Sequence, residues 1–326
     1  MPSRARPVLR KRTPAPVVLH SAPLVLPISA EPVRDGAVAV RGDRVLRVGA
    51  RSDLLAALPV VREHRWPGTV VAGLVDACSS APGPGVTARA EVVTDLAEAA
   101  GLAGVAYVRV ACRSEHDWEE SGRDALITAI READLPCAVG VAAHTPDPQV
   151  LEDVAVLART FGLRLLADAG RHSLAALDEA GVLGPHCHVA CARPLDPGER
   201  KLLRLRGSVA AVCPAAADDF LALFDEGNRV ALGSGATGLL GQAHAIREQA
   251  RRRGSRVREL DRRLVEAATS GGARALGLHR GAARIGSLGP GSRADFAVFD
   301  AGGRHPYAAL LAQPPCLATV VGGAIT

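Results

Sequence analysis

The chain has 326 residues, of which 48% are hydrophobic and 22% are charged, and its formal net charge is +5. This composition can bury a large core, which excludes a wholly disordered chain and a collagen-like repeat. No run of eighteen apolar residues occurs, so the sequence predicts neither a membrane span nor a secretory signal. We therefore expect a cytoplasmic protein.

Arginine carries nearly all of the positive charge, because lysine occurs only twice. The densest basic segment, residues 247–263, also contains acidic residues and has no aromatic side chain that could stack on a base. We expect a solvated helical face there and no nucleic-acid partner. Cys112, Cys137 and Cys213 fall in or beside apolar runs, where reduced core thiols are expected.

Both ends of the chain carry β patterns. Residues 1–15 are basic and show no hydrophobic periodicity, so we expect a disordered tail. From residue 16 to residue 67, apolar runs separated by polar turns predict a small module rich in strands. A similar pattern returns near the C-terminus, where a tight turn at 289–291 precedes the apolar run 296–299. We predict one composite β-sandwich domain, formed by residues 16–67 together with 281–326.

In the segment between them, residues 68–280, short apolar strands alternate with amphipathic helices, which indicates a parallel α/β sheet or barrel. The predicted strands are residues 70–77, 104–111, 137–143, 163–167, 188–192, 209–213 and 230–232. Seven strands are clear and an eighth is not, and the segment is shorter than the roughly 250 residues typical of a (β/α)8 barrel. The predicted fold class is therefore α/β, a TIM-like (β/α)8 barrel with one strand–helix unit unaccounted for.

Residues 286–296, GSLGPGSRADF, resemble a C-terminal motif of the amidohydrolase superfamily, Gly-Ser-Leu-x-Pro-Gly-x-x-Ala-Asp-Leu/Phe. Further segments are similar in the same order, at residues 35–49, 72–77, 212–214, 230–233 and 267–278. The resemblance covers nearly everything after residue 15, and within the superfamily it is strongest to the imidazolonepropionase and aminodeoxyfutalosine deaminase branch. It implies a distorted barrel with one or two zinc or iron ions at the carboxyl ends of the strands, and hydrolysis of non-peptide C–N bonds.

The metal ligands that the resemblance implies are substituted in this chain. Cys78 and Ser80 stand where the first strand of the family carries His-x-His, a spacing that lets two side chains grip one ion. Asp168 stands at the histidine of the fifth strand, and Cys191 at the histidine of the sixth. Gly235 replaces the aspartate of the eighth strand, so this position offers no oxygen for coordination or proton transfer.

Two interpretations follow. In the first, the metal site is lost, and the protein is a catalytically degenerate, amidohydrolase-like protein that binds a small ligand or serves as a partner subunit, without a cofactor. In the alternative, Cys78, Asp168 and Cys191 hold zinc, and the protein is an active hydrolase of a cyclic amide, an amidine or an aminopurine-type substrate. His186 and His188 could add a ligand or a base to such a site.

The pocket candidates at the barrel mouth are Cys78, Ser80, His144, Asp168, Cys191 and Ser234. His144 matches a histidine that follows the fourth strand in relatives, and Ser234 ends a strand where such barrels keep their sites. The segment 81–102, between the first two predicted strands, is too short for a long substrate-covering loop. We expect a small-molecule ligand and a homo- or hetero-oligomer, and the sequence leaves the identity of the ligand and the enzymatic activity open.

Overall fold

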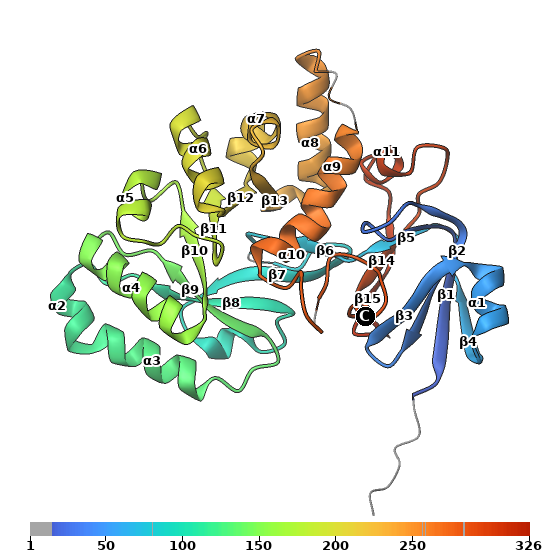
Figure 1. Ribbon diagram of the computed structural model, residues 1–326, viewed down its shortest axis with the longest axis horizontal. Helices are drawn as coiled ribbons and strands as arrows, with labels where there is room; N and C mark the ends of the chain where they lie inside the picture. The colour runs from blue at the N-terminus through green and yellow to red at the C-terminus, as the bar shows by residue number, and fades with distance from the viewer. Residues whose placement is uncertain (1–14, 80, 256, 258, 283) are drawn as a thin grey trace, which may run out of the picture.

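The computed structural model describes residues 15–79, 81–255, 257, 259–282 and 284–326 (Figure 1). The predicted tail, apart from Ala15, and the candidate Ser80 lie outside the described residues. Strands from both ends of the chain form one eight-stranded sheet. Its strands are β1 (Val17–Leu26), β2 (Val33–Arg41), β3 (Arg44–Ala50), β4 (Val60–Arg65), β5 (Thr69–Ala72), β14 (Phe296–Phe299), β15 (Cys316–Val321) and β16 (Ala324–Ile325).

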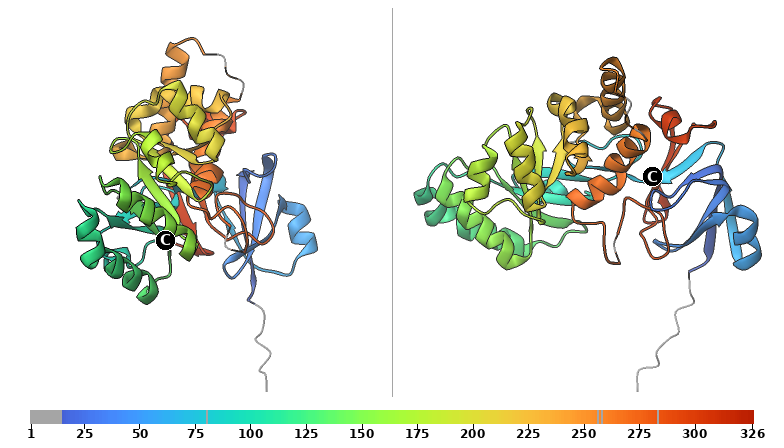
Figure 2. Two further views of the ribbon diagram at one scale, coloured as in Figure 1. Left: turned by 60° about the vertical axis from the view of Figure 1, so that its left-hand side comes forward. Right: turned by 45° about the horizontal axis from the view of Figure 1, so that its top comes forward.

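β1 organises this sheet. It pairs antiparallel with β2, so that Leu19 lies opposite Ala39, and its other edge pairs parallel with β4 and then with β5. β5 also pairs antiparallel with β14, with Val71 opposite Ala297, and so joins the two ends of the chain. The sheet lies beside the α/β part of the molecule, as both views in Figure 2 show. Two short helices belong to these segments, α1 (Arg51–Ala57) and α11 (Pro306–Leu310).

The rest of the chain forms a nearly closed barrel of eight parallel strands in sequence order. The strands are β6 (Leu74–Asp76), β7 (Val86–Val93), β8 (Gly104–Val110), β9 (Ala138–Ala143), β10 (Arg164–Asp168), β11 (Cys187–Cys191), β12 (Val209–Val212) and β13 (Arg229–Leu232). The first and last strands meet where the N–H of Ala77 donates to the carbonyl oxygen of Leu232 at 3.0 Å. The predicted strand 70–77 divides at Gly73, so that β5 belongs to the mixed sheet and β6 to the barrel.

β7 is the eighth strand that the sequence analysis left open. It lies within the segment 81–102, between the first two predicted strands. Its small inward residues, Ala88 and Ala90, weaken the hydrophobic signal, and its polar side includes Arg89 and Glu91, which form an ion pair at 2.5 Å. The barrel therefore has all eight strands. The segment is short because the connection from β7 to β8 contains the 3-10 helix η1 (Leu96–Ala99) in place of a full α-helix.

Most of the remaining helices cover the outside of the barrel and its amino end (Figure 1), whereas two 3-10 helices follow the carboxyl ends of β12 and β13. The remaining helices are α2 (Glu115–Asp117), the π-helix η2 (Trp118–Gly122), α3 (Arg123–Glu132), α4 (Pro148–Phe161), α5 (Leu174–Glu179), α6 (Pro197–Arg206), the 3-10 helix η3 (Pro214–Asp219), α7 (Phe220–Asp225), the 3-10 helix η4 (Gly235–Thr237), α8 (Leu239–Arg252), α9 (Leu260–Glu266), the π-helix η5 (Ala267–Gly271) and α10 (Gly272–Ala275). Among the described residues, none of the helices combines the length and apolar character needed to cross a membrane.

Alternation along the strands divides the core into two layers. One cluster contains Val105, Ala142 and Leu166 together with residues of other barrel strands, and so fills the interior. Ala273 of α10 belongs to this cluster and closes the amino end of the barrel. The alternate residues, such as Val141, pack outward against helices including α4 and α8. The carboxyl ends of the strands are left uncovered by this arrangement, and the candidate site lies there.

Candidate functional site

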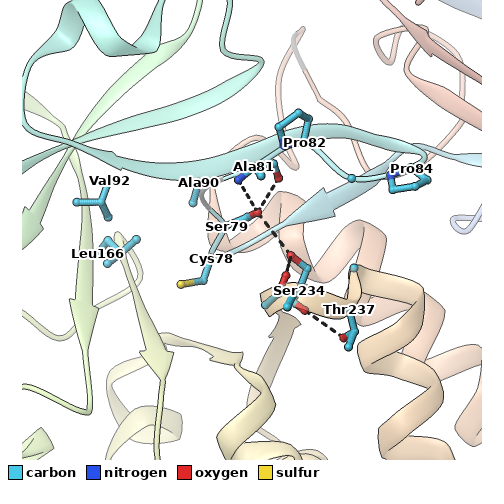
Figure 3. Close-up of a pocket in the computed structure, with 14 residues that line it drawn as sticks. Cys78, Ser79, Ala81, Pro82, Pro84, Ala90, Val92, Leu166, Ser234 and Thr237 are labelled. Carbon is cyan, nitrogen blue, oxygen red and sulfur yellow. Dashed lines mark hydrogen bonds between the residues drawn. The ribbon is translucent and has the colours of Figure 1, made fainter.

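A cavity of about 760 Å³ opens at the carboxyl ends of the barrel strands (Figure 3). Its walls come from β7, β10 and the segments that follow β6 and β13. The lining residues are Cys78, Ser79, Ala81, Pro82, Gly83, Pro84, Ala90, Val92, Leu166, Ser234, Gly235, Ala236, Thr237 and Gly238. Two of the predicted pocket residues, Cys78 and Ser234, are among them. The cavity is mainly apolar, with hydroxyl and thiol groups along one side.

Asp76 connects the segments that follow the first and last strands of the barrel, β6 and β13, next to this cavity. Its Oδ1 accepts hydrogen bonds from the backbone N–H of Cys78 at 3.1 Å and of Ser234 at 3.2 Å. The Asp76 residue is 1% exposed, and burial raises the pKa of its carboxyl group while the hydrogen bonds oppose that rise. Asp76 is not among the site residues predicted from the sequence, because its role depends on the meeting of β6 and β13.

Cys213 is a further residue at the mouth that the sequence analysis missed. It directly follows the last residue of β12, and the alternation of inward residues Val209 and Ala211 continues to it. A Cβ atom added to Gly233 would lie 3.0 Å from Cys78 Cβ and 3.4 Å from Cys213 Sγ, so both cysteines lie beside Gly233. The interaction between the two side chains lowers the pKa of Cys78 and raises that of Cys213. Cys213 was predicted to be a core thiol, but the structure places it at the mouth of the barrel. The alternation of inward-facing residues along β12 is the sequence pattern that indicates this position.

Asp168 and His144 lie at the ends of neighbouring strands, β10 and β9. Asp168 Oδ1 accepts the N–H of Gly170 at 2.7 Å, and its Oδ2 is 3.4 Å from Arg171 Nε. His144 is half-buried, and its Nδ1 has no hydrogen-bond partner among the described residues. Burial, with the positive charge of Arg171, lowers the pKa of His144 to about 4. Neither Asp168 nor His144 belongs to the cavity lining.

The structure does not place Cys191 at the mouth. Asp168 pairs with Ala190, so these two residues point to the same side of the sheet and Cys191 points to the other. Cys191 is fully buried in the outer layer of the core together with Leu195, and burial raises the pKa of its thiol. The prediction of Cys191 as a pocket residue or zinc ligand is corrected here, because one step along a strand reverses the side on which a residue lies.

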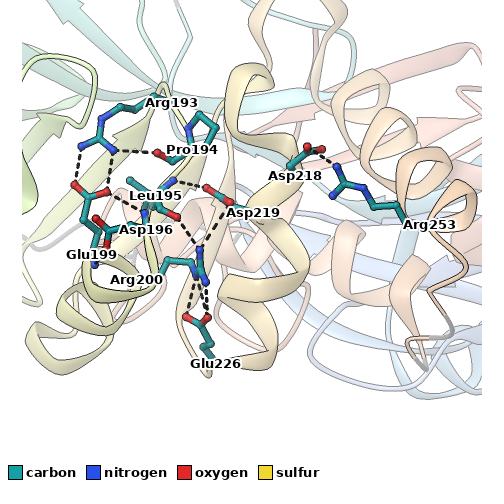
Figure 4. A network of polar contacts seen from close by, with 10 residues as sticks. All are labelled: Arg193, Pro194, Leu195, Asp196, Glu199, Arg200, Asp218, Asp219, Glu226 and Arg253. Carbon is teal, nitrogen blue, oxygen red and sulfur yellow. Dashed lines mark hydrogen bonds and ion pairs between the residues drawn. The ribbon is translucent and has the colours of Figure 1, made fainter.

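Polar contacts hold the chain that follows Cys191 in this orientation (Figure 4). Asp219 Oδ2 accepts the N–H of Leu195 at 2.6 Å, and Arg200 Nη1 donates to the carbonyl oxygen of Leu195 at 2.7 Å. Arg200 also pairs with Glu226 at 2.9 Å. Turning Cys191 toward the cavity would require these contacts to break.

His186 and His188 also lie away from the mouth. His186 precedes β11 and therefore lies at the amino end of the barrel. His188 is 0% exposed inside the barrel, where its Nε2 donates to the carbonyl oxygen of Ala77 at 3.0 Å. Its Nδ1 then accepts from the hydroxyl group of Tyr107 at 3.4 Å. Both nitrogens of His188 are satisfied, so it is a buried structural residue rather than a ligand or base at the mouth.

The residues at the mouth do not fit the metal centre that the resemblance implies. Across the described part of the chain, no three side chains of His, Cys, Asp or Glu converge to hold an ion. Of the three ligands in the zinc alternative, Cys191 faces away from the cavity. Gly235 begins η4 and offers no side-chain oxygen. A catalytic zinc site takes three protein ligands and an open position, and this set does not supply them.

Acid is expected to destabilise the fold through buried neutral histidines. Burial and nearby His64 lower the pKa of His20 to about 4, and burial lowers that of His188 to about 3, from an ordinary value of 6.5. Their contribution to the free energy of unfolding is complete above pH 6.5 and is lost as the pH falls through 4. The reason is that these histidines bind protons in the unfolded chain at a higher pH than in the folded chain. The free energy of unfolding should fall by roughly 3 to 5 kcal/mol between about pH 7.5 and about pH 4.5.

Urea denaturation at both pH values measures this loss. His20→Asn should remove about half of the histidine contribution, whereas His116→Asn, on the exposed surface, should leave the pH dependence of wild type. Equal pH dependence in His20→Asn and wild type would contradict the assignment.

Comparison with known proteins finds similarity in structure alone. No protein-family model matches the sequence, and no curated protein matches it. Among solved structures, an adenosine deaminase from Xanthomonas campestris with bound zinc is 19% identical, with a TM-score of 0.76, and the match covers 96% of this chain and 93% of that chain. An amidohydrolase from an environmental sample of the Sargasso Sea is 19% identical, with a TM-score of 0.74 and coverages of 95% and 92%.

An atrazine chlorohydrolase from Arthrobacter aurescens, solved with zinc, is 16% identical, with a TM-score of 0.73, and the match covers 94% of each chain. At these identities the likeness establishes a shared fold. The predicted TIM-like barrel is therefore confirmed, whereas membership of the amidohydrolase superfamily stays a prediction. The narrower branch within that superfamily stays a prediction.

Proposed function

We propose that this protein binds a small nitrogen heterocycle in the cavity at the barrel mouth, without the hydrolytic metal centre implied by the amidohydrolase resemblance. The main support for this proposal is the identity of the residues at the carboxyl ends of the barrel strands. Cys78 and Asp168 stand there without a third ligand, and Gly235 stands in the place of the general base. Among the described residues, this set provides neither the three metal ligands nor the base that would ionise an attacking water.

The cavity supports binding by its size and its chemistry. Its volume of about 760 Å³ lies within the range of small-molecule sites. Val92 and Leu166 supply apolar walls for a planar ring, and the hydroxyl groups of Ser79, Ser234 and Thr237 can exchange hydrogen bonds with ring or exocyclic nitrogen atoms. The solved neighbours named above include an adenosine deaminase and an atrazine chlorohydrolase, which suggests purines and triazines as the first compounds to test.

Filling the cavity should abolish binding. Val92 is 37% exposed and lines the cavity, so Val92→Trp adds an indole where a ligand would lie without disturbing the core. Titration calorimetry with adenosine, atrazine and a cyclic amide should detect a ligand of the wild type and at least a tenfold weaker affinity in the variant. The matched control is Val156→Trp, at a 48% exposed position on α4, which should bind as wild type does.

Two results would count against this proposal. One is the absence of binding for every compound of the panel. The other is an unchanged affinity in Val92→Trp, which would place the ligand elsewhere on the molecule.

Hydrolysis of a non-peptide C–N bond is the second candidate function. The solved neighbours favour it over a loss of activity, because they are a deaminase and hydrolases, and two of them hold zinc. Metal analysis and an ammonia-release assay after zinc loading decide between the candidates. Loss of activity predicts substoichiometric zinc and no ammonia. Stoichiometric zinc that disappears in Cys78→Ser and in Asp168→Asn, together with ammonia release, would establish the hydrolase instead.

A further inference from the structure

A group of basic side chains lies at the amino end of the barrel, opposite the cavity. Arg164 and Arg229 are the first residues of β10 and β13, and Arg274 belongs to α10, which closes this end. His279 and Arg280 follow α10 in the chain. We call these five residues the amino-end cluster. All strands of a parallel barrel begin at the same end, so the fold gathers the cluster from three separate parts of the sequence.

Hydrogen bonds to the backbone hold two of the guanidinium groups in place. Arg164 Nη2 donates to the carbonyl oxygen of Ala275 in α10 at 2.7 Å, and its Nη1 donates to that of Pro185 at 3.2 Å. Arg229 Nη1 donates to the carbonyl oxygen of Gly207 at 3.0 Å. A Cβ atom added to Gly207 would lie 3.5 Å from this Nη1 and 3.9 Å from Pro185 Cγ. Arg229 therefore approaches the same short segment before β11 that Arg164 contacts.

The amino-end cluster has no acidic partner in the described part of the chain. Every Asp and Glu of the sequence is described, and none of them forms an ion pair with a member of the cluster. Elsewhere buried arginines are paired, as Arg200 is with Glu226. Arg164 Nε and His279 Nδ1 also have no hydrogen-bond partner among the described residues. The protein therefore leaves the positive charge of the cluster unneutralised.

The members of the cluster also act on one another. Burial, together with the charges of Arg229 and Arg280, lowers the pKa of Arg274. Burial lowers the pKa of His279 as well, and the charges of all four arginines of the cluster add to this effect. Like charges held close together repel one another and destabilise the folded protein, and a bound anion relieves this repulsion.

We propose that the amino-end cluster binds a compact polyphosphate, either free pyrophosphate or the diphosphate or triphosphate group of a nucleotide. The planar guanidinium group of arginine presents N–H donors that match two oxygen atoms of a phosphate. Four such groups in one place favour several phosphate charges over a single anionic group. The cluster is compact, because all four arginines act on His279, and this favours a short chain of phosphates over an extended polyanion.

This site is separate from the cavity at the mouth, because the two lie at opposite ends of the barrel. The inference therefore does not depend on the proposed function. A ligand that contacts both Arg229 and Arg274 would join β13 to α10. Binding should consequently raise the thermal midpoint of unfolding, as expected for a ligand that binds only the folded protein.

The test measures the binding of pyrophosphate and of ATP to the purified full-length protein by titration calorimetry, in the presence of EDTA. We expect dissociation constants of about 100 μM or lower at low ionic strength. They should rise at least tenfold in about 0.5 M NaCl, because salt screens exposed charges. Adenosine should not displace pyrophosphate. Equal affinities for pyrophosphate and ATP would show that the polyphosphate group is sufficient, and tighter binding of ATP would identify a nucleotide as the ligand.

Single substitutions locate the site. Arg280 is exposed, so Arg280→Gln should fold as wild type does and bind pyrophosphate at least about fivefold more weakly. Arg229→Gln should weaken binding similarly. Arg47→Gln is the matched control, because Arg47 is exposed on β3 and its loss changes the net charge equally. It should bind pyrophosphate as wild type does, and so should Val92→Trp, which fills the cavity at the mouth.

The proposal is overturned if neither pyrophosphate nor ATP binds at low ionic strength. It is also overturned if Arg47→Gln weakens binding as much as Arg280→Gln, because the protein would then respond to net charge alone. A duplex DNA that binds at least tenfold more tightly than pyrophosphate, and loses this affinity in Arg280→Gln, would replace the compact site with a nucleic-acid surface.

Discussion

Asp76→Ala is expected to lower the free energy of unfolding by about 2 to 5 kcal/mol. The carboxylate accepts the N–H groups of Cys78 and Ser234, and both contacts lie in the region where β6 and β13 close the barrel. Alanine leaves two donors without a partner where water has little access, since Asp76 is buried. Each such donor costs about 1 to 3 kcal/mol. Urea denaturation followed by far-ultraviolet circular dichroism measures the loss.

The matched control is Asp76→Asn, which keeps one side-chain oxygen for the same two N–H groups while removing the buried charge. It should lose less stability than the alanine variant. Because Asp76 also positions the backbone of Cys78 and Ser234, alanine should weaken binding in the cavity more than asparagine does. An alanine variant as stable as wild type would show that the barrel closes without this carboxylate.

Gly272→Ala is expected to cost about 3 kcal/mol or more in stability, or to prevent accumulation of folded protein. Gly272 begins α10, and an added Cβ would lie 2.0 Å from the carbonyl oxygen of Val75 in β6. Alanine is intrinsically better than glycine in a helix by up to about 1 kcal/mol. That gain is smaller than the cost of moving the helix that closes the amino end of the barrel away from β6.

The control for this substitution is Gly302→Ala, at a loop position where no atom lies within 4 Å of the added Cβ. It should change the thermal midpoint by little. If Gly272→Ala unfolds at the same temperature as wild type, the close contact between α10 and β6 is not required by the fold.

Local pattern was sufficient to predict most of the architecture. Seven of the eight barrel strands are apolar runs bounded by turns, and such runs form strands in whatever sheet they join. β7 was not predicted because its inward-facing residues include Ala88 and Ala90. Alanine differs little in hydrophobicity from the residues beside it, so the alternation typical of a strand is weak. The sequence also places Cys78 and Gly235 at the carboxyl ends of barrel strands, but their correspondence to metal-ligand positions stays a prediction.

The sequence by itself determined the α/β class and the strands contributed by both ends of the chain, whereas the replacement of metal-binding side chains stays a prediction from the resemblance. Only the tertiary structure decided which of the predicted site residues lie together. Cys191 faces outward because the pairing of Asp168 with Ala190 sets the side of every residue in β11. Cys213 and Asp76 belong to the mouth because the last strand closes on the first, and contacts across that closure have no local signal in the sequence.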